Sequence, residues 1–151
     1  MSYSYKDGLR EGVIFVFYKD GQILVEHRPT KTQKKETFFL NGSIELKDKV
    51  QNKDYRIEAL LREINEELQG KVTATKYEYL GEVAVEGIGV LFYVYIILEW
   101  EGSIPEYTVE DNKKFADLQW IKLSEKEKYF EFDSAFQVSE MIEKFISNQS
   151  T

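Results

Sequence analysis

The segment from Val90 to Leu98 is the longest apolar run in the chain, with nine consecutive apolar residues. It is too short to span a bilayer as a helix, which needs about 20 such residues. Its β-branched and aromatic side chains favour a strand, and a strand that is apolar on both faces must be covered on both sides. The run therefore predicts a central strand between two other layers.

Further strands are expected on both sides of this run. Residues 12–18 and 22–28 read as a hairpin around Asp20-Gly21, which is a turn signal. A polar, cationic loop (RPTKTQKKET) follows, and a short strand at 37–40 ends at a predicted turn, Asn41-Gly42. The remaining strands are expected at 72–85, 88–100 and 118–123.

Two segments instead show a helical period. From Asp54 to Leu68 one apolar stripe is formed by Ile57, Leu60, Leu61, Ile64 and Leu68, and Gly70 is a stop signal. Near the end, Ser134 and Gln137 fit a capping box before a second stripe: Val138, Met141, Ile142, Phe145 and Ile146. The order of elements predicts a single α/β domain over residues 1–151, with a mixed sheet sandwiched between helices.

Composition excludes several kinds of chemistry. The 151 residues contain no cysteine and one histidine, His27, which rules out disulfides, thiol nucleophiles and multi-histidine metal sites. The formal charge of -7 argues against a stable nucleic acid complex, because affinity for phosphate backbones needs clustered cations. The start, MSYSYKDGLREG, does not look like a signal peptide, so we expect a cytoplasmic protein that does not bind membranes.

Three carboxylates cluster on the first predicted helix. At about 100° per residue, Glu63, Glu66 and Glu67 fall within roughly 100° of arc, beside the apolar stripe. Such a cluster suits a hard cation such as Mg²⁺, which prefers oxygen ligands. A solvated acidic face is the alternative, since like charges at this spacing cost only about 0.2–0.5 kcal/mol each.

The same segment resembles the Nudix box of the Nudix (MutT-like) hydrolases, which reads Gly, five residues, Glu, seven residues, Arg-Glu-U-x-Glu-Glu-x-Gly-U with U aliphatic. The matching residues are Arg62, Glu63, Ile64, Glu66 and Glu67. Seven residues separate Asp54 from Arg62, which places Asp54 at the first Glu of the motif. Nineteen residues separate Gly42 from Arg62 where the motif has thirteen, so six extra residues are expected within LKDKVQNK. The resemblance extends over roughly residues 10–145.

The resemblance implies a Nudix fold and hydrolysis of a nucleoside diphosphate linked to a group X, giving a nucleotide and phosphorylated X. It implies Mg²⁺, with Mn²⁺ as a substitute, held by Glu66 and Glu67 and further by the Gly42 carbonyl. Glu63 would be either a metal ligand or the base that takes a proton from water. Arg62 would orient carboxylates, with Asp54 or the box glutamates as partners.

Four residues outside this centre are weaker candidates for substrate contacts. Arg28 matches a position where relatives carry an arginine near the ligand, and Glu45 stands in a Gly-x-x-Glu turn. Asp54 is alternatively a helix N-cap, which aspartate forms well. Glu110, or Asp111 beside it, lies in an acidic loop that is otherwise expected to be solvated.

An alternative to the hydrolase is a Nudix-fold module that binds nucleotides with weak or no turnover, as the insertion and Asp54 suggest. The partner in either case is a small nucleotide. The sequence names neither X nor the base, although the short chain favours a nucleoside triphosphate slightly. For the assembly, a homodimer is the commonest alternative to a monomer.

Overall fold

The fold is described from a computed structural model over residues 2–28 and 36–149. Its helices are α1 (Tyr55–Glu67) and α2 (Asp133–Gln149), with three short 3₁₀ segments, η1 (Leu46–Asp48), η2 (Glu86–Ile88) and η3 (Leu123–Lys128). Its strands are β1 (Tyr5–Lys6), β2 (Leu9–Lys19), β3 (Gln22–Arg28), β4 (Glu36–Ser43), β5 (Val72–Val85), β6 (Val90–Gly102), β7 (Tyr107–Glu110) and β8 (Lys113–Lys122).

The strands form one mixed sheet in the order β5-β6-β2-β4-β3-β8-β7, with β1 added alongside β2. Strands β2 and β6 are parallel over Arg10–Phe17, and the other pairs are antiparallel. Strand β4 changes partner in its middle: residues 36–39 pair with β3, whereas residues 40–43 pair with β2. The second half of β4 therefore runs along the start of β2 and lies near α1.

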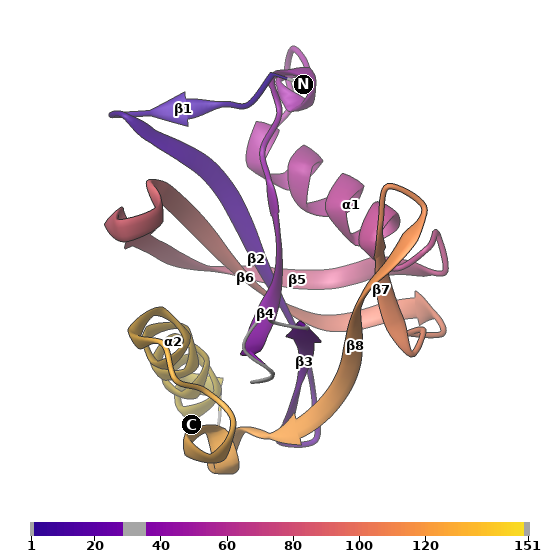
Figure 1. Ribbon diagram of the computed structural model, residues 1–151, viewed down its shortest axis with the longest axis vertical. Coiled ribbons are helices and arrows are strands. Elements are labelled where there is room, and N and C mark those ends of the chain that lie inside the picture. The colour runs from indigo at the N-terminus through magenta and orange to yellow at the C-terminus, as the bar shows by residue number, and fades with distance from the viewer. Residues whose placement is uncertain (1, 29–35, 150–151) are drawn as a thin grey trace.

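The two helices cover opposite faces of the sheet, as Figure 1 shows. Alternate residues of β2 explain this arrangement, because successive side chains of a strand point to opposite faces. Val13, Phe15 and Phe17 pack in one core with Leu60 and Ile64 of α1. Ile14 and Val16 pack in the other core with the α2 residues Val138 and Ile142. The predicted sandwich of helices around a mixed sheet is confirmed.

Most predicted elements are confirmed, and β5 has the predicted limits. The turn predicted at Asn41-Gly42 is wrong, because both residues are in β4 and pair with β2. Strand β7 was expected to be a solvated loop, but it pairs with β8 and buries Thr108. Ser134 lies inside the first turn of α2 rather than at its cap, because the helix begins at Asp133. Most of the predicted cationic loop (residues 29–35) lies outside the described residues.

No helix in the described ranges is long and apolar enough to cross a membrane. The apolar run at Val90–Leu98 is the middle of β6, which lies between β5 and β2 and is largely buried. This agrees with the prediction of a central strand covered on both faces.

Candidate active site

Helix α1 carries the carboxylates, and its local sequence explains where it begins. Asp54 is the N-cap: its backbone is extended and its side chain accepts a hydrogen bond from the Arg56 amide at 2.9 Å. The helix buries Leu60 and Ile64 in the core, so the residues next to this stripe lie at the edge of the buried face. Glu63 is 7% exposed, whereas the Glu66 side chain is 51% exposed.

Glu63 lies directly against the backbone of Gly42. A Cβ atom built on Gly42 would lie 2.1 Å from the Cδ atom of Glu63, which no real side chain tolerates. The absence of a side chain at Gly42 is thus what lets the Glu63 carboxylate reach β4. This contact between Gly42 and Glu63 joins β4 to α1.

Arg62 holds the carboxylates of this region together. Its Nη1 donates to Glu63 and to Glu66, both at 3.0 Å, and its Nη2 donates to the Ser43 carbonyl at 3.0 Å. The same Nη1 atom forms an ion pair with Glu45 at 3.1 Å. Burial by itself would lower the pKa of Arg62, but the surrounding carboxylates raise it overall, so the guanidinium stays charged.

The strongest partner of Arg62 is Asp48, not the predicted Asp54. Arg62 donates from Nε and Nη2 to the two carboxylate oxygens of Asp48, each at 2.8 Å, in a bidentate pair. Asp48 is 4% exposed, and its pKa is lowered because bonds from Arg62 and the Glu45 amide outweigh its burial. Five residues separate Gly42 from Asp48, as in the motif, so the six extra residues follow Asp48.

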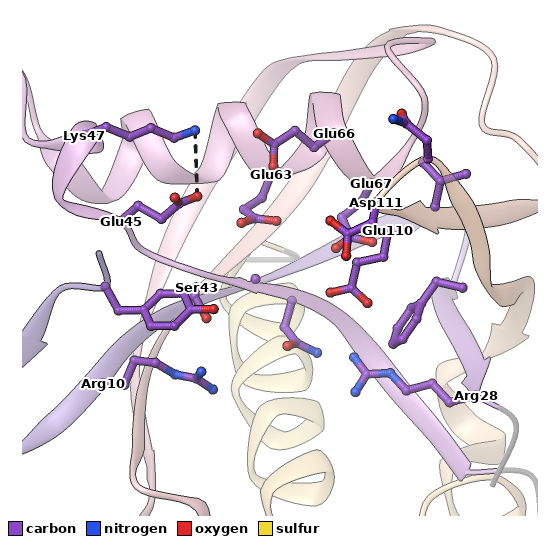
Figure 2. A pocket seen from close by; sticks show the side chains of 16 residues that line it. Arg10, Arg28, Ser43, Glu45, Lys47, Glu63, Glu66, Glu67, Glu110 and Asp111 are labelled. Carbon is purple, nitrogen blue, oxygen red and sulfur yellow. Dashed lines mark ion pairs between the residues drawn. The ribbon is translucent and has the colours of Figure 1, made fainter. Parts of the chain in front are cut away.

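A cavity of about 660 Å³ adjoins this network, a size typical of small-ligand sites. It is lined by Gly42, by six carboxylate residues and by three cationic residues. The acids are Glu45, Glu63, Glu66, Glu67, Glu110 and Asp111, and the cations are Arg10, Arg28 and Lys47. In Figure 2 the glutamates of α1 lie on one side of the cavity, and Arg10 and Arg28 lie on the other side.

Two of these carboxylates are protonated more readily than an ordinary glutamate. Burial raises the pKa of Glu63 to about 7, against the opposing charge of Arg62. Burial also raises the pKa of Glu67 to about 8, and the neighbouring charges of Glu26, Glu63 and Glu110 add to this effect. Raised pKa values of this kind are common at functional sites, and a cation bound beside the two groups would favour their charged forms.

Arg28 is held rigidly at the cavity wall. Its Nε donates to Glu26 at 2.8 Å, and its Nη2 contacts the same oxygen. Its guanidinium also lies between two rings, 4.5 Å from the centroid of Phe38 and 5.0 Å from that of Phe115. Glu26 is 2% exposed, and burial raises its pKa even though Arg28 opposes the shift. The pair thus fixes the direction of Arg28.

A divalent cation fits this donor set chemically. The Glu67 side chain forms no hydrogen bond or ion pair with any residue that the structure describes, although it is half-buried. A buried carboxylate of this kind needs a proton or a cation. Within residues 2–28 and 36–149, no three acidic or histidine side chains already converge as a metal-binding group, because Glu63 and Glu66 point to Arg62.

The cavity thus contains most of the predicted site residues. Gly42, Glu45, Glu63, Glu66, Glu67, Arg28 and Glu110 line it, Arg62 supports it from behind, and Asp54 is not among the lining residues. Residues that the sequence reasoning missed are Asp48, Glu26 and Arg10. The motif has an acid separated from its glycine by five residues, and counting forward from Gly42 in this way leads to Asp48. The signal for Glu26 is a glutamate within an otherwise apolar strand segment, ILVEHR.

Comparisons with known proteins place this geometry in a known fold. No family model matches the chain, and no curated protein matches it. Solved structures do match: an ADP compounds hydrolase has a TM-score of 0.70 and 14% identity, over 92% of this chain and 74% of that one. A MutT NUDIX hydrolase from Burkholderia pseudomallei has a TM-score of 0.63 and 20% identity, over 88% and 97%.

A third similar structure is the NUDIX domain of Shewanella oneidensis NrtR, which was solved with ADP ribose. It has a TM-score of 0.64 and 16% identity, over 94% of this chain and 90% of that domain. The chain therefore has the Nudix fold. At these identities the similarity defines the fold alone, so the activity must be argued from the site.

Proposed function

We propose that this chain is a Mg²⁺-dependent pyrophosphohydrolase that cleaves a nucleoside diphosphate linked to a group X. The observation that carries the proposal is that Glu63, Glu66 and Glu67 line one cavity, with Glu63 seated on Gly42. The lining has six carboxylate and three cationic residues, so an anionic diphosphate enters only when additional cations offset the repulsion.

The metal is assigned to Glu66, Glu67 and Glu63, with the Gly42 carbonyl as a further ligand and Mn²⁺ as a substitute for Mg²⁺. When bound, the metal supplies charge neutralisation at the diphosphate and its leaving oxygen. Glu63 is assigned either to the metal or, as the alternative, to the general base that takes a proton from the attacking water. Arg62 acts by fixing the orientation of Glu63 and Glu66.

Arg28 is assigned to a phosphate of the nucleotide. Its guanidinium has five N–H donors, and Glu26 occupies those of Nε and part of Nη2, so donors remain for a ligand. Glu45 and Glu110 lie at the cavity wall and are assigned to its edge, where Glu110 adds a carboxylate near Glu67.

The test is hydrolysis of a panel of substrates with Mg²⁺: nucleoside triphosphates, dinucleoside polyphosphates, nucleotide sugars and ADP-ribose. Glu67→Gln should reduce turnover by about 100-fold or more, because it removes one charge of the metal site. Glu58→Gln is the matched control, since Glu58 is on the same helix and pairs with Lys53 outside the cavity. Parental activity of the Glu67→Gln protein would contradict the site assignment.

The second candidate is a nucleotide-binding module without turnover. It is favoured by one observation: Glu63 and Glu66 are engaged by Arg62, so the described acids are not arranged around a cation. Tight binding of ADP-ribose or a nucleotide with no product from any member of the panel would support this candidate over the hydrolase.

A further inference from the structure

Arg10 differs from the other arginines of this protein in its charge environment. The chain has four arginines, and Arg28, Arg56 and Arg62 each pair with a carboxylate. Arg10 forms no ion pair with any residue in the described ranges, although it lines a cavity that is rich in carboxylates. Its guanidinium instead lies over the ring of Tyr3, 5.2 Å from the centroid.

The backbone around Arg10 and Tyr3 is firmly held. Tyr3 forms a bridge with Glu45, and the neighbouring Ser4 is bonded through its backbone to Ile44 and Glu11. Ser4 and Glu11 are 0% and 1% exposed, and the Ser4 hydroxyl donates to the Glu11 carboxylate at 2.5 Å.

The buried Glu11 carboxylate fixes this part of the protein further. It also accepts a hydrogen bond from the Tyr55 hydroxyl at 2.6 Å and one from the Tyr93 hydroxyl. It thereby ties residues 2–6 to α1 and β6. Because side chains alternate along an extended chain, Tyr3 and Arg10 point away from this buried network. Both side chains are half-buried and line the cavity.

Arg10 and Arg28 lie toward opposite ends of the cavity, with the α1 glutamates facing them (Figure 2). The end near Arg28 is acidic, because Glu67, Glu110 and Asp111 gather there. The end near Arg10 also has Lys47, whose Nζ is 3.9 Å from a Glu45 oxygen. Among the described residues that line the cavity, Arg10 is thus the cation without a carboxylate partner, and it lies at this end.

We propose that Tyr3 and Arg10 form a subsite for an additional phosphate of the substrate, beyond the two that the metal site holds. The preferred substrate then has at least three phosphates in a row, as in a nucleoside triphosphate or a dinucleoside polyphosphate. Substrates in which X is a neutral sugar leave Arg10 without an anion. The role of this subsite in substrate preference rests on the proposed hydrolase function, whereas the binding test below does not require turnover.

The direct test measures affinity with Mg²⁺ present, by calorimetry, for α,β-methylene-ATP and α,β-methylene-ADP, which differ by one phosphate. In the parent protein the three-phosphate analogue should bind at least about 10-fold more tightly, since a hydrogen-bonded charge pair contributes about 1.5–3 kcal/mol. Arg10→Ala should reduce this preference to less than about 3-fold. Lys6→Ala is the matched control: it removes the same charge from β1, outside the cavity, and should keep the preference.

Arg10→Gln serves as a second variant if Arg10→Ala does not fold, and Tyr3→Leu tests the ring beneath the guanidinium. The inference is overturned if the parent shows no preference for the three-phosphate analogue, or if neither Arg10 variant changes it.

Hydrolysis assays distinguish failure of the subsite proposal from failure of the hydrolase proposal. If the parent cleaves no substrate but loses its preference in Arg10→Ala, the subsite stands and the hydrolase proposal fails. If it cleaves ATP and ADP-glucose and Arg10→Ala lowers kcat/KM equally for both, the subsite assignment fails.

Discussion

Arg62 and Asp48 form a bidentate ion pair, with both hydrogen bonds at 2.8 Å, between α1 and the 3₁₀ turn that follows β4. The Asp48 carboxylate is nearly inaccessible to water, and the Arg62 side chain is 15% exposed. The pair therefore connects the two segments that carry Gly42 and the box glutamates.

Asp48→Ala is expected to destabilise the protein by about 2–4 kcal/mol, because it leaves a buried guanidinium with less opposing charge. Activity should fall as well, since Arg62 also orients Glu63 and Glu66. Asp54→Ala is the comparison variant: it removes the helix cap, at about 1 kcal/mol, and an exposed ion pair with Arg56, and should leave kcat within about 2-fold. Urea unfolding and steady-state kinetics measure both effects. A larger kinetic defect for Asp54→Ala would show that Asp54, rather than Asp48, serves the site.

Gly42→Ala should disrupt the site without changing its charge. The new methyl group would overlap Glu63, which must move away from β4. Displacement of about 1 Å at a reacting group can cost about 100-fold in rate, so we expect a loss of that order in kcat. Gly87→Ala is the control, because no atom lies within 4 Å of a Cβ built there. Equal activity of the two variants would mean that the contact between Gly42 and Glu63 has no role.

Metal-free protein should become less stable as the pH rises from about 5 to 8. The folded-state pKa values of Glu63 and Glu67, about 7 and about 8, lie above the ordinary value of 4.5, so the folded state binds more protons across this window. Groups with lowered pKa values, such as Asp48 and Glu11, lose their contribution only at more acidic pH.

Thermal unfolding in EDTA and in excess Mg²⁺, at about pH 5.5 and about pH 8.5, measures this dependence. The stabilisation by Mg²⁺ should be larger at the higher pH, where the carboxylates bind metal without releasing protons. Glu67→Gln should flatten the pH dependence in EDTA. Stability that rises with pH in EDTA over this window would contradict the expected protonation of the two glutamates.

Glu26→Gln should act through Arg28. It removes the buried charge that holds the guanidinium, so KM should rise several-fold while kcat changes less. Thr108→Val is the control, because the Thr108 hydroxyl contacts the other Glu26 oxygen and the Ala116 carbonyl at 3.4 Å each and does not contact Arg28. A fall in kcat with unchanged KM would instead place Glu26 in the chemical step.

Helix α1 and most strands of the sheet, but not β1 and β7, were predictable because their periods are strong. Strand β5 and the apolar stripe of α1 follow directly from alternation and from the 3.6-residue repeat. The turn assigned to Asn41-Gly42 was wrong because the glycine is needed for the approach of Glu63, a tertiary contact that a local pattern does not reveal.

The box glutamates were found from their spacing, whereas their supporting residues depend on contacts far apart in the sequence. Asp48 was missed because the motif can be counted forward from Gly42 or back from Arg62. With the insertion, the first count leads to Asp48 and the second to Asp54, and only the fold shows that Asp48 contacts Arg62. Arg10 and Arg28, which Glu26 holds in place, belong to strands that are distant from α1 in the chain, and pairing through β4 brings both arginines to the same cavity.

The hydrogen bonds of the buried Glu11 carboxylate hold residues 2–6 in place independently of the α1 glutamates. The carboxylate secures residues 2–6 through hydroxyl groups alone and touches none of the acidic side chains of the α1 face. Substitutions at Tyr3 or Arg10 can therefore change the substrate preference without displacing the glutamates of α1. In a lineage of such proteins, we expect positions 3 and 10 to vary more than Ser4, Glu11 and the glutamates of α1.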